Sequence, residues 1–408
     1  MQIDSGDTTW ILVSSALVLM MTPALAFFYG GMVRKKNILS TLNLSFIMIC
    51  IISVQWVLFG YTLSFGSDVG GLVGGFDFLG FSGVGPEPAE IAPTIPHMLF
   101  AAFQMMFAII TPALITGAFV ERVRFKTFLV FSLLWATLVY DPVCHWVWGP
   151  GGILGADGLG ALDFAGGTVV HITAGFSALA FALAIGPRKG FGSVSFGANN
   201  IPFSVLGAGL LWMGWFGFNG GSALAADGLA VNALVTTNTA AAAAGCVWMI
   251  LSWLDNKPSV LGIVTGAVVG LVAVTPGAGF VTPLGALVIG ALAAPISYYA
   301  IKYIKGRNLI DESLDVFACH GLGGLWGALA TGLFATTAVN AGGANGLFYG
   351  DPGQFITQLG AALLVIVFSF GVTYVIAKVL DAVMGIRVSK NAEEAGLDIS
   401  EHAERAYS

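Results

Sequence analysis

Two histidines, His171 and His320, lie in apolar stretches that are long enough to cross a membrane. An ionisable side chain at membrane depth is costly unless it lines a polar pathway, so each histidine is a candidate functional residue. A neutral imidazole has one donor and one acceptor nitrogen, so two facing imidazoles can share a hydrogen bond and still bind a small polar solute or relay a proton. The alternatives are two unrelated histidines satisfied by backbone groups, or a metal site.

An aspartate precedes each histidine: Asp163 comes before His171, and Asp315 before His320. An aspartate at a helix start can accept hydrogen bonds from free backbone N–H groups and favours the positive end of the helix dipole. We therefore expect both aspartates to cap the histidine helices. Direct coordination of a cation by either carboxylate is the alternative.

Aromatic residues are a further signal. Phe103 and Phe107 lie four residues apart, Trp215 and Phe218 lie three apart, and Ser222 follows Phe218 by four. Trp148 ends the fourth predicted span. A tryptophan and a hydroxyl at the outer end of a span can hold a small cation by cation–π attraction and one hydrogen bond. A single aromatic is more often an interfacial or lipid-facing anchor. The hypothesis of a cation site therefore depends on the occurrence of these aromatic residues together with the two histidines.

The composition indicates an all-α polytopic membrane protein. The chain has 408 residues, of which 57% are hydrophobic and only 9% are charged, whereas soluble domains carry about 25% charged residues. Basic runs typical of nucleic-acid binding are absent from the sequence, which predicts no nucleic-acid partner. Neither a nucleophile–base spacing nor a nucleotide-binding loop occurs, so we expect no enzyme activity and no cofactor.

Long apolar runs predict eleven membrane spans, at about 10–33, 40–66, 97–120, 127–148, 166–186, 201–222, 231–254, 260–277, 281–304, 315–338 and 354–380. With the N-terminus outside, all 16 Lys and Arg residues fall on the inner side or beyond the last span. This satisfies the positive-inside rule without exception. The C-terminus is then cytoplasmic.

The span count fits two five-helix repeats of inverted orientation and a final helix. The transmembrane domain would cover 1–384, with repeats at 1–190 and 195–340 and an eleventh helix at 354–384, followed by a cytoplasmic regulatory tail at 385–408. Each histidine lies about six residues into its predicted helix, or ~9 Å. Because the two helices enter from opposite sides of a ~30 Å core, this estimate leaves ~12 Å between the histidines.

Four stretches resemble the ammonium transporter family (Amt, with its yeast and Rhesus relatives), in its prokaryotic Amt type. The most specific stretch is DFAGGTVVH at 163–171, and the others are FFYGGMVRKKN at 27–37, GWFGFNGGS at 214–222 and DVFACHG at 315–321. The resemblance covers nearly the whole chain. It implies eleven spans in two inverted halves, assembled as a homotrimer with one pore per subunit.

The resemblance also implies roles for individual residues. Trp148, Phe107 and Ser222 would form the external ammonium recruitment site, and Phe107 and Phe218 the gate below it. The pore histidines would be His171 and His320, with Trp215 in the pore wall and Asp163 in support. The tail resembles the family's regulatory tail, which implies a cytoplasmic PII-type (GlnK-like) partner.

The function implied is ammonium transport for nitrogen uptake, as a multi-pass protein of the plasma (inner) membrane. Ammonium has roughly the size and charge of potassium but can lose a proton, so a dry pore can select it by passing ammonia. A sensor or receptor on the same scaffold is the runner-up. A gas or water channel is a third interpretation, and it would need no cation site.

Overall fold

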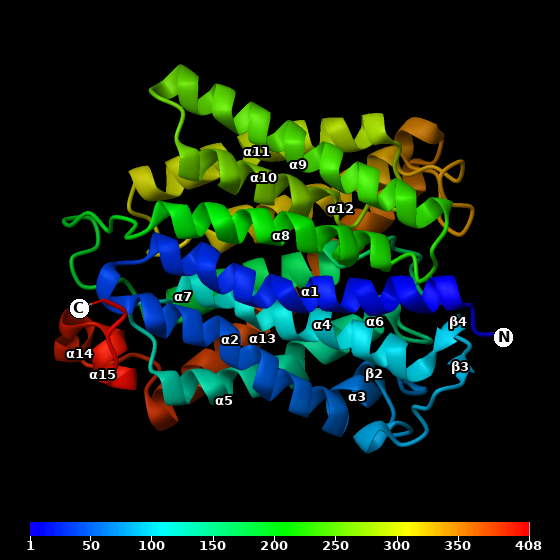
Figure 1. Cartoon of the computed structure of the whole chain (residues 1–408), viewed down its shortest axis with the longest axis horizontal. Helices are drawn as coiled ribbons and strands as arrows, with labels where there is room; N and C mark the ends of the chain where they lie inside the picture. Colours follow the sequence, from blue (N-terminus) through cyan, green and yellow to red (C-terminus); the bar gives the residue numbers. More distant parts are fainter. Residues whose placement is uncertain (408) are drawn as a thin grey trace.

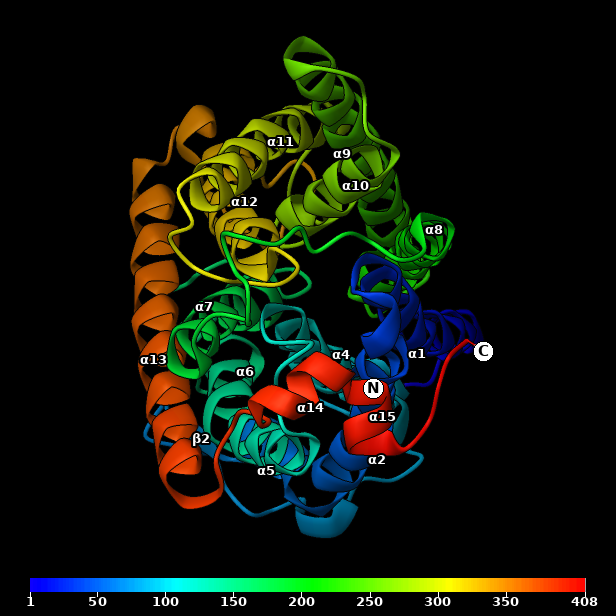
Figure 2. The ribbon, with the colours of Figure 1, turned by 90° about the vertical axis from the view of Figure 1, so that its left-hand side faces the viewer.

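The computed structural model describes residues 1–407, and it is predominantly helical. The helices that form the bundle are α1 (Ser5–Met32), α2 (Ile38–Gln55), α3 (Tyr61–Phe65), α4 (His97–Ile115), α5 (Phe125–Trp135), α6 (Asp141–Trp148), α7 (Thr173–Ile185), α8 (Ile201–Gly221), α9 (Gly228–Asp255), α10 (Val260–Val274), α11 (Pro283–Gly306), α12 (Gly323–Phe334) and α13 (Pro352–Met384). Most of them run along the longest axis of the molecule (Figure 1). Seen end-on, α1 to α7 and α8 to α12 form two neighbouring groups, and α13 lies along one edge of both (Figure 2).

Short π-helical segments belong to four of the long apolar helices, at Trp56–Gly60, Ala136–Tyr140, Gly167–Ile172 and Phe317–Leu322. The first two join α2 to α3 and α5 to α6. The last two, labelled η6 and η7, lead into α7 and α12 and contain the two histidines. Such π-turns are rare and are frequently found at functional sites.

Within residues 1–407, ten helical stretches are long and apolar enough to cross a membrane. They correspond to ten of the eleven predicted spans. The remaining predicted span, at 260–277, contains α10, which has 15 residues and falls short of the usual spanning length. The polytopic all-α fold is therefore confirmed, while the count of eleven spans and the inverted-repeat layout stay predictions.

Polar residues at the helix starts explain where several of these helices begin. The Asp4 carboxylate accepts the backbone N–H groups of Gly6 and Asp7 at the start of α1. Thr282 and Asp351 cap α11 and α13 in the same way. Each of these two caps is followed by a proline, which suits the first helical position because it has no N–H to satisfy.

The two ends of the bundle differ in structure. The N-terminus lies at one end, together with two small antiparallel hairpins formed by β1 (Asp68–Val69) with β2 (Val73–Gly74), and by β3 (Pro88–Ala89) with β4 (Ala92–Pro96) (Figure 1). The C-terminal helices α14 (Lys390–Ala395) and α15 (Leu397–His402) lie at the opposite end. We call these the N-terminal end and the tail end.

Hydrogen bonds from the tail hold α14 and α15 against the loops of the tail end. Glu393 accepts the backbone N–H of Lys189, and the Asp398 carboxylate accepts the N–H of Ser40 at the start of α2. Arg387 forms an isolated β-bridge with Val123. The tail therefore contacts the loops before α2, before α5 and after α7.

A buried ion-pair cluster lies beneath the tail. Arg188 pairs with Glu121 and with Asp311, each at 2.6 Å, and Arg34 pairs with Glu121 at 2.9 Å. Burial acts to raise the pKa of Glu121, but Arg188 and Arg34 outweigh it and hold that pKa below its ordinary value. The cluster ties together loops from both groups of helices.

Glycines allow the two histidine-bearing helices to cross closely. A Cβ at Gly175 would lie 2.0 Å from the backbone nitrogen of Gly321, and a Cβ at Gly324 would lie 2.9 Å from the Cβ of His171. Small residues at such crossings let backbones approach within a membrane. This contact brings the starts of the two helices together at the centre of the bundle.

Candidate functional site

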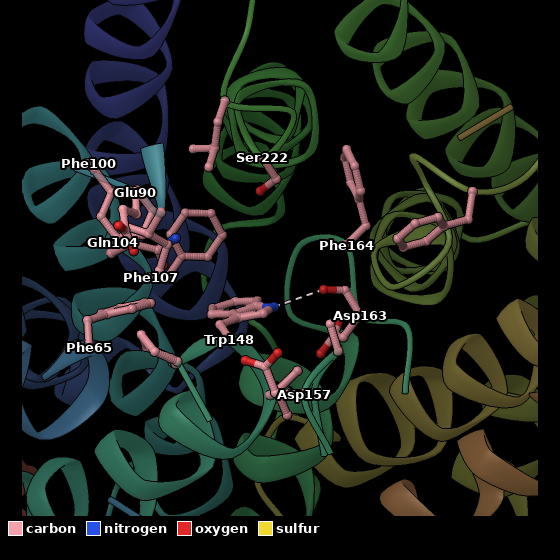
Figure 3. Close-up of a pocket in the computed structure, with 17 residues that line it drawn as sticks. Phe65, Glu90, Phe100, Gln104, Phe107, Trp148, Asp157, Asp163, Phe164 and Ser222 are labelled. Carbon is pink, nitrogen blue, oxygen red and sulfur yellow. Dashed lines mark hydrogen bonds between the residues drawn. The ribbon is translucent and has the colours of Figure 1, made fainter. Parts of the chain in front are cut away.

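A cavity of about 490 Å³ opens at the N-terminal end, and we call it the Trp148 cavity. Trp148 lies between Phe107 and Asp163 in Figure 3, with Ser222 nearby. The ring centroids of Phe107 and Trp148 are 5.8 Å apart at an interplanar angle of 83°. The structure thus brings the three predicted recruitment residues, Trp148, Phe107 and Ser222, to one cavity.

The hydrogen bonds of this cavity leave acceptor groups free for a cation. The indole N–H of Trp148 donates to the backbone carbonyl of Asp163 at 2.8 Å, which fixes the ring (Figure 3). The hydroxyl of Ser222 donates to the carbonyl of Phe218 at 2.8 Å. Because that bond uses the only hydroxyl hydrogen, the oxygen of Ser222 keeps lone pairs that can accept from an ammonium N–H.

Two phenylalanines separate the Trp148 cavity from the interior. The rings of Phe107 and Phe218 have centroids 4.4 Å apart, and each side chain is only 1% exposed. Their interplanar angle is 45°, so they pack as a tilted pair. The two rings thus lie together where the sequence predicts a gate, and a solute must displace at least one ring to pass. The gating role itself stays a prediction.

Below these rings, the two histidines are in contact. Nδ1 of His320 lies 3.2 Å from Nδ1 of His171, so in one pairing of tautomers they share a hydrogen bond. Nε2 of His171 is buried and has no hydrogen-bond partner within residues 1–407. The histidine pair therefore offers at least one unused nitrogen to a small polar solute.

The gap of ~12 Å estimated between the histidines from sequence is wrong. Each histidine is the fourth or fifth residue of its π-turn, yet the ring centroids are 5.3 Å apart. The estimate placed both helix starts at the membrane surface. Most residues of η6 and η7 are buried within the bundle, so the assumption that both helices start at the membrane surface does not hold.

The walls around the histidines are apolar and aromatic. Trp215 stacks on His171 with centroids 5.5 Å apart, and its indole N–H donates to Thr275 at 2.9 Å. Phe218 also stacks on His171. The cavity that these side chains line with His320 measures about 10 Å³, which is about the space of one water molecule. Only a molecule of that size fits without rearrangement.

Asp163 caps the helix of His171, as predicted. Its carboxylate accepts four backbone N–H groups, from Gly166, Gly167, Thr168 and Val169, at 2.7 to 3.1 Å. These four bonds occupy the lone pairs that a carboxylate has available. The geometry therefore favours the capping role over direct coordination of a cation.

The corresponding prediction for Asp315 is wrong. Glu312, rather than Asp315, accepts the N–H of Phe317 at the start of η7, at 2.7 Å. The carboxylate of Asp315 pairs instead with Lys305 at 2.6 Å. Asp315 also has a positive φ of 62°, an uncommon conformation for a residue other than glycine. The lysine on α11 thus draws the aspartate away from the helix start.

A second cavity, of about 170 Å³, opens towards the tail end, and we call it the tail-side cavity. Its lining includes Lys305, Asp315, Cys319 and His320. His320 therefore borders both this cavity and the small central one. The resulting order is the Trp148 cavity, the two phenylalanines, the histidine pair and the tail-side cavity.

Sequence reasoning missed three residues of this path. Thr275 fixes Trp215, Glu312 caps the helix of His320, and Gln104 lines the Trp148 cavity. A signal existed for Gln104, because it is a lone amide in the apolar stretch FAAFQMMFAII. The other two carry no sequence signal that separates them from similar residues elsewhere in the chain.

Comparisons with known proteins agree on one family. The model of the Ammonium Transporter Family matches residues 9–407. The chain is 50% identical over 403 residues to an ammonium transporter of Bacillus subtilis (strain 168), covering 98% of each chain. It is 49% identical over 402 residues to ammonium transporter Amt1 of Archaeoglobus fulgidus, covering 98% of this chain and 99% of that one. It also resembles the crystal structure of Candida albicans Mep2, with a TM-score of 0.88, 36% identity and coverage of 96% of this chain and 88% of that one.

Proposed function

The chain belongs to the ammonium transporter family, and from that premise we propose that it recruits ammonium in the Trp148 cavity, removes a proton and conducts ammonia past the paired histidines. It is a multi-pass membrane protein and an ammonium transporter, not an enzyme. The observation that carries the proposed mechanism is the contact between His171 and His320 directly below an aromatic closure. Two polar side chains in an otherwise apolar path can form hydrogen bonds with a small polar molecule that passes them.

Recruitment rests on the groups that face the Trp148 cavity. The faces of Trp148 and Phe107 attract a cation through their ring quadrupoles, an effect worth about 0.5–2 kcal/mol. The oxygen of Ser222 accepts one N–H of the ion. These interactions bind ammonium at the cavity but do not replace its hydration shell.

Selection against potassium rests on desolvation. An intact cation that enters the dry region below Phe107 and Phe218 loses its water without compensation. Ammonium can transfer its proton to water on the entrance side and continue as ammonia, whereas potassium has no proton to lose and stays charged. The neutral ammonia that remains can hydrogen-bond to His171 and His320 in a space of about 10 Å³.

The proposed setting is the plasma (inner) membrane, with the N-terminus outside and the tail in the cytoplasm. Support comes from the positions of the two ends of the chain at opposite ends of the bundle (Figure 1), and from the predicted placement of all 16 basic residues towards the tail end. We also propose a homotrimer with one path per subunit. The docked tail, 385–408, is the proposed contact for a PII-type (GlnK-like) regulatory protein.

A sensor on the same scaffold is the alternative, and it is not favoured. The curated relatives that match along almost the whole chain are named as transporters. A gas or water channel would give no reason for aromatic faces and a free hydroxyl oxygen in one external cavity.

Current recordings on liposomes test the proposed mechanism. Wild-type protein should give saturable currents or fluxes with ammonium and none with potassium. His171→Asp should pass potassium, because a fixed negative charge beside His320 stabilises an intact cation, whereas His171→Ala should not do so by that route. Trp148→Leu should retain the fold and show weaker saturable transport of ammonium. A folded His171→Asp protein that carries ammonium and still rejects potassium would refute the role of the histidines in selection.

A further inference from the structure

A buried carboxyl group on α6 lies outside the candidate path and has no charged partner. Asp141 is 0% exposed, and its Oδ1 atom is buried without a hydrogen-bond partner within residues 1–407. Its other oxygen, Oδ2, accepts a side-chain N–H of Gln55 at 2.7 Å. No lysine, arginine or histidine within residues 1–407 forms an ion pair with Asp141. An ionised carboxylate here would lose its water without a compensating charge, which is costly within a membrane span.

The amide of Gln55 also has an unused acceptor. Its nitrogen donates to Oδ2 of Asp141 and, at 3.4 Å, to the hydroxyl of Thr137, so both amide hydrogens are used. Its oxygen, Oε1, is buried without a partner within residues 1–407. The two side chains therefore have two unused acceptors and no hydrogen left to donate to either.

The backbone accommodates this pair at two π-turns. Gln55 is the last residue of α2 before the π-turn Trp56–Gly60, and Asp141 is the first residue of α6 after the π-turn Ala136–Tyr140. Gly60 leaves room for the amide, because a Cβ at that position would lie 2.5 Å from Oε1 of Gln55. Such turns are frequent at functional sites, and these two contain no residue of the candidate path.

We propose that Asp141 and Gln55 form a proton-binding site, in which the bound proton makes Asp141 a neutral carboxylic acid. The acid donates its O–H from Oδ1 to Oε1 of Gln55, while the amide of Gln55 donates to Oδ2. One added hydrogen thus satisfies both unused acceptors and removes the buried charge. The ligand is a proton taken from water, and the site is separate from the path proposed for ammonia.

Neighbouring groups supply no positive charge that would favour the ionised form. α2 contains no charged residue. On α6, both ring nitrogens of His145 are bonded elsewhere, to the carbonyl of Ser64 and the carboxylate of Asp68. The remaining titratable groups on neighbouring segments can carry only negative charge, and they are Tyr61 on α3, Tyr140 before α6, Cys144 on α6 and Asp163 before η6. A negative charge on any of them would favour the protonated form of Asp141.

The test is the thermal stability of Asp141→Asn relative to the wild type, in one detergent, between pH 5 and 8. Asparagine offers Gln55 the same donor and acceptor as the protonated acid, so the variant should fold. The unfolded wild type releases the proton near pH 4, whereas the folded protein keeps it, so the stability of the wild type falls as pH rises. The unfolding temperature of Asp141→Asn minus that of the wild type should therefore increase by about 2 °C per pH unit. Because both proteins share every other titratable group, this difference isolates Asp141.

Asp77→Asn is the matched control. Asp77 lies in an exposed turn after β2, and the hydrogen bond from the backbone N–H of Ser67 holds the pKa of its carboxyl below the ordinary value. Its carboxyl is ionised in the folded and the unfolded chain over this pH range. The difference between Asp77→Asn and the wild type should therefore stay constant from pH 5 to 8.

Infrared spectra give a second readout, because a protonated carboxylic acid has its own C=O band. At pH 8 the wild type should show such a band that Asp141→Asn lacks. If no band is lost and the difference in unfolding temperature does not vary with pH, Asp141 is ionised and the inference is wrong. Stabilisation of the wild type alone when sodium chloride replaces choline chloride would reveal a bound metal cation and also overturn it. A failure of Asp141→Asn to fold would count against the pair, since asparagine preserves both hydrogen bonds.

Discussion

Asp163 and Glu312 each cap a helix that carries one of the paired histidines, but their surroundings differ. Asp163 accepts four backbone N–H groups, and within residues 1–407 it pairs with no lysine or arginine. Glu312 accepts the N–H of Phe317 and lies beside a second acid, Asp315, which pairs with Lys305. The two halves thus start their histidine helices with the same π-turn and different chemistry.

Because the surroundings of Asp163 and Glu312 differ, we expect different properties at the two ends of the path. Four short bonds fix the start of η6 and so position His171 and, through the carbonyl that receives its indole N–H, Trp148. At the other end, burial and then the charge of Asp315 raise the pKa of Glu312 to about 8. The N-terminal end is therefore expected to be rigid, and the tail end to respond to pH near neutrality.

The largest expected effect comes from removing the four-bond cap. Asp163→Ala leaves four backbone N–H groups without their acceptor. Some of these groups are too deeply buried to form a hydrogen bond with water instead. We expect a loss of about 4 kcal/mol of stability, against about 1–2 kcal/mol for Glu312→Ala, which removes an ordinary cap. Thermal unfolding of the purified proteins in the same detergent measures both.

The ratio of the two losses is the informative quantity. Asp163→Asn keeps the shape of the side chain and retains one oxygen acceptor, so it should fall between wild type and Asp163→Ala. Equal losses for Asp163→Ala and Glu312→Ala would remove the contrast between the two helix starts.

A smaller effect should appear in the pH dependence of stability. The folded protein keeps the proton of Glu312 up to about pH 8, whereas the unfolded chain releases it at the ordinary carboxylate value, near pH 4.5. The folded state therefore binds more protons in that window, and stability falls as pH rises through it. From this group alone we expect the protein to be about 2 kcal/mol less stable at pH 8 than at pH 6.

Glu312→Gln tests this contribution, since glutamine keeps the acceptor oxygen and does not ionise. Its unfolding temperature should vary less between pH 6 and 8 than that of the wild type. A variant with the same pH profile as the wild type would show that Glu312 ionises at its ordinary pKa, and the contrast with Asp163 would then be one of hydrogen bonding alone.

Much of this contrast could not be read from sequence. The spans were predictable because long apolar runs have few alternatives in a membrane protein. The cap at Asp163 was predictable because an aspartate at a helix start can accept free backbone N–H groups. The same argument failed at Asp315, where Lys305, ten residues earlier on another helix, captures the carboxylate. Local spacing carries no information about that competitor.

The candidate path shows the same limit. The types of residue that would bind and pass ammonium were recognisable, and the structure brings His171 and His320 together. Their contact was not derivable, because the depth of a helix start depends on how far the preceding loop enters the bundle. Gln104 was detectable as a polar residue in an apolar span, but its place in the wall of the Trp148 cavity is a property of the fold.

The smallest expected effect concerns the lysine that separates the two acids. The pair of Lys305 and Asp315 is partly exposed, with the lysine side chain at 51%, so Lys305→Met should cost less than about 1 kcal/mol. Its charge also favours the ionised form of Glu312, and its removal should raise the pKa of Glu312 further. The pH range over which stability falls should then extend upwards.

Lys302→Met is the matched control, because Lys302 lies on the same helix and pairs with Asp255 instead. If the two lysine variants have the same pH profile, Lys305 has no influence on Glu312, and the pH response of the tail end depends on burial and Asp315 alone.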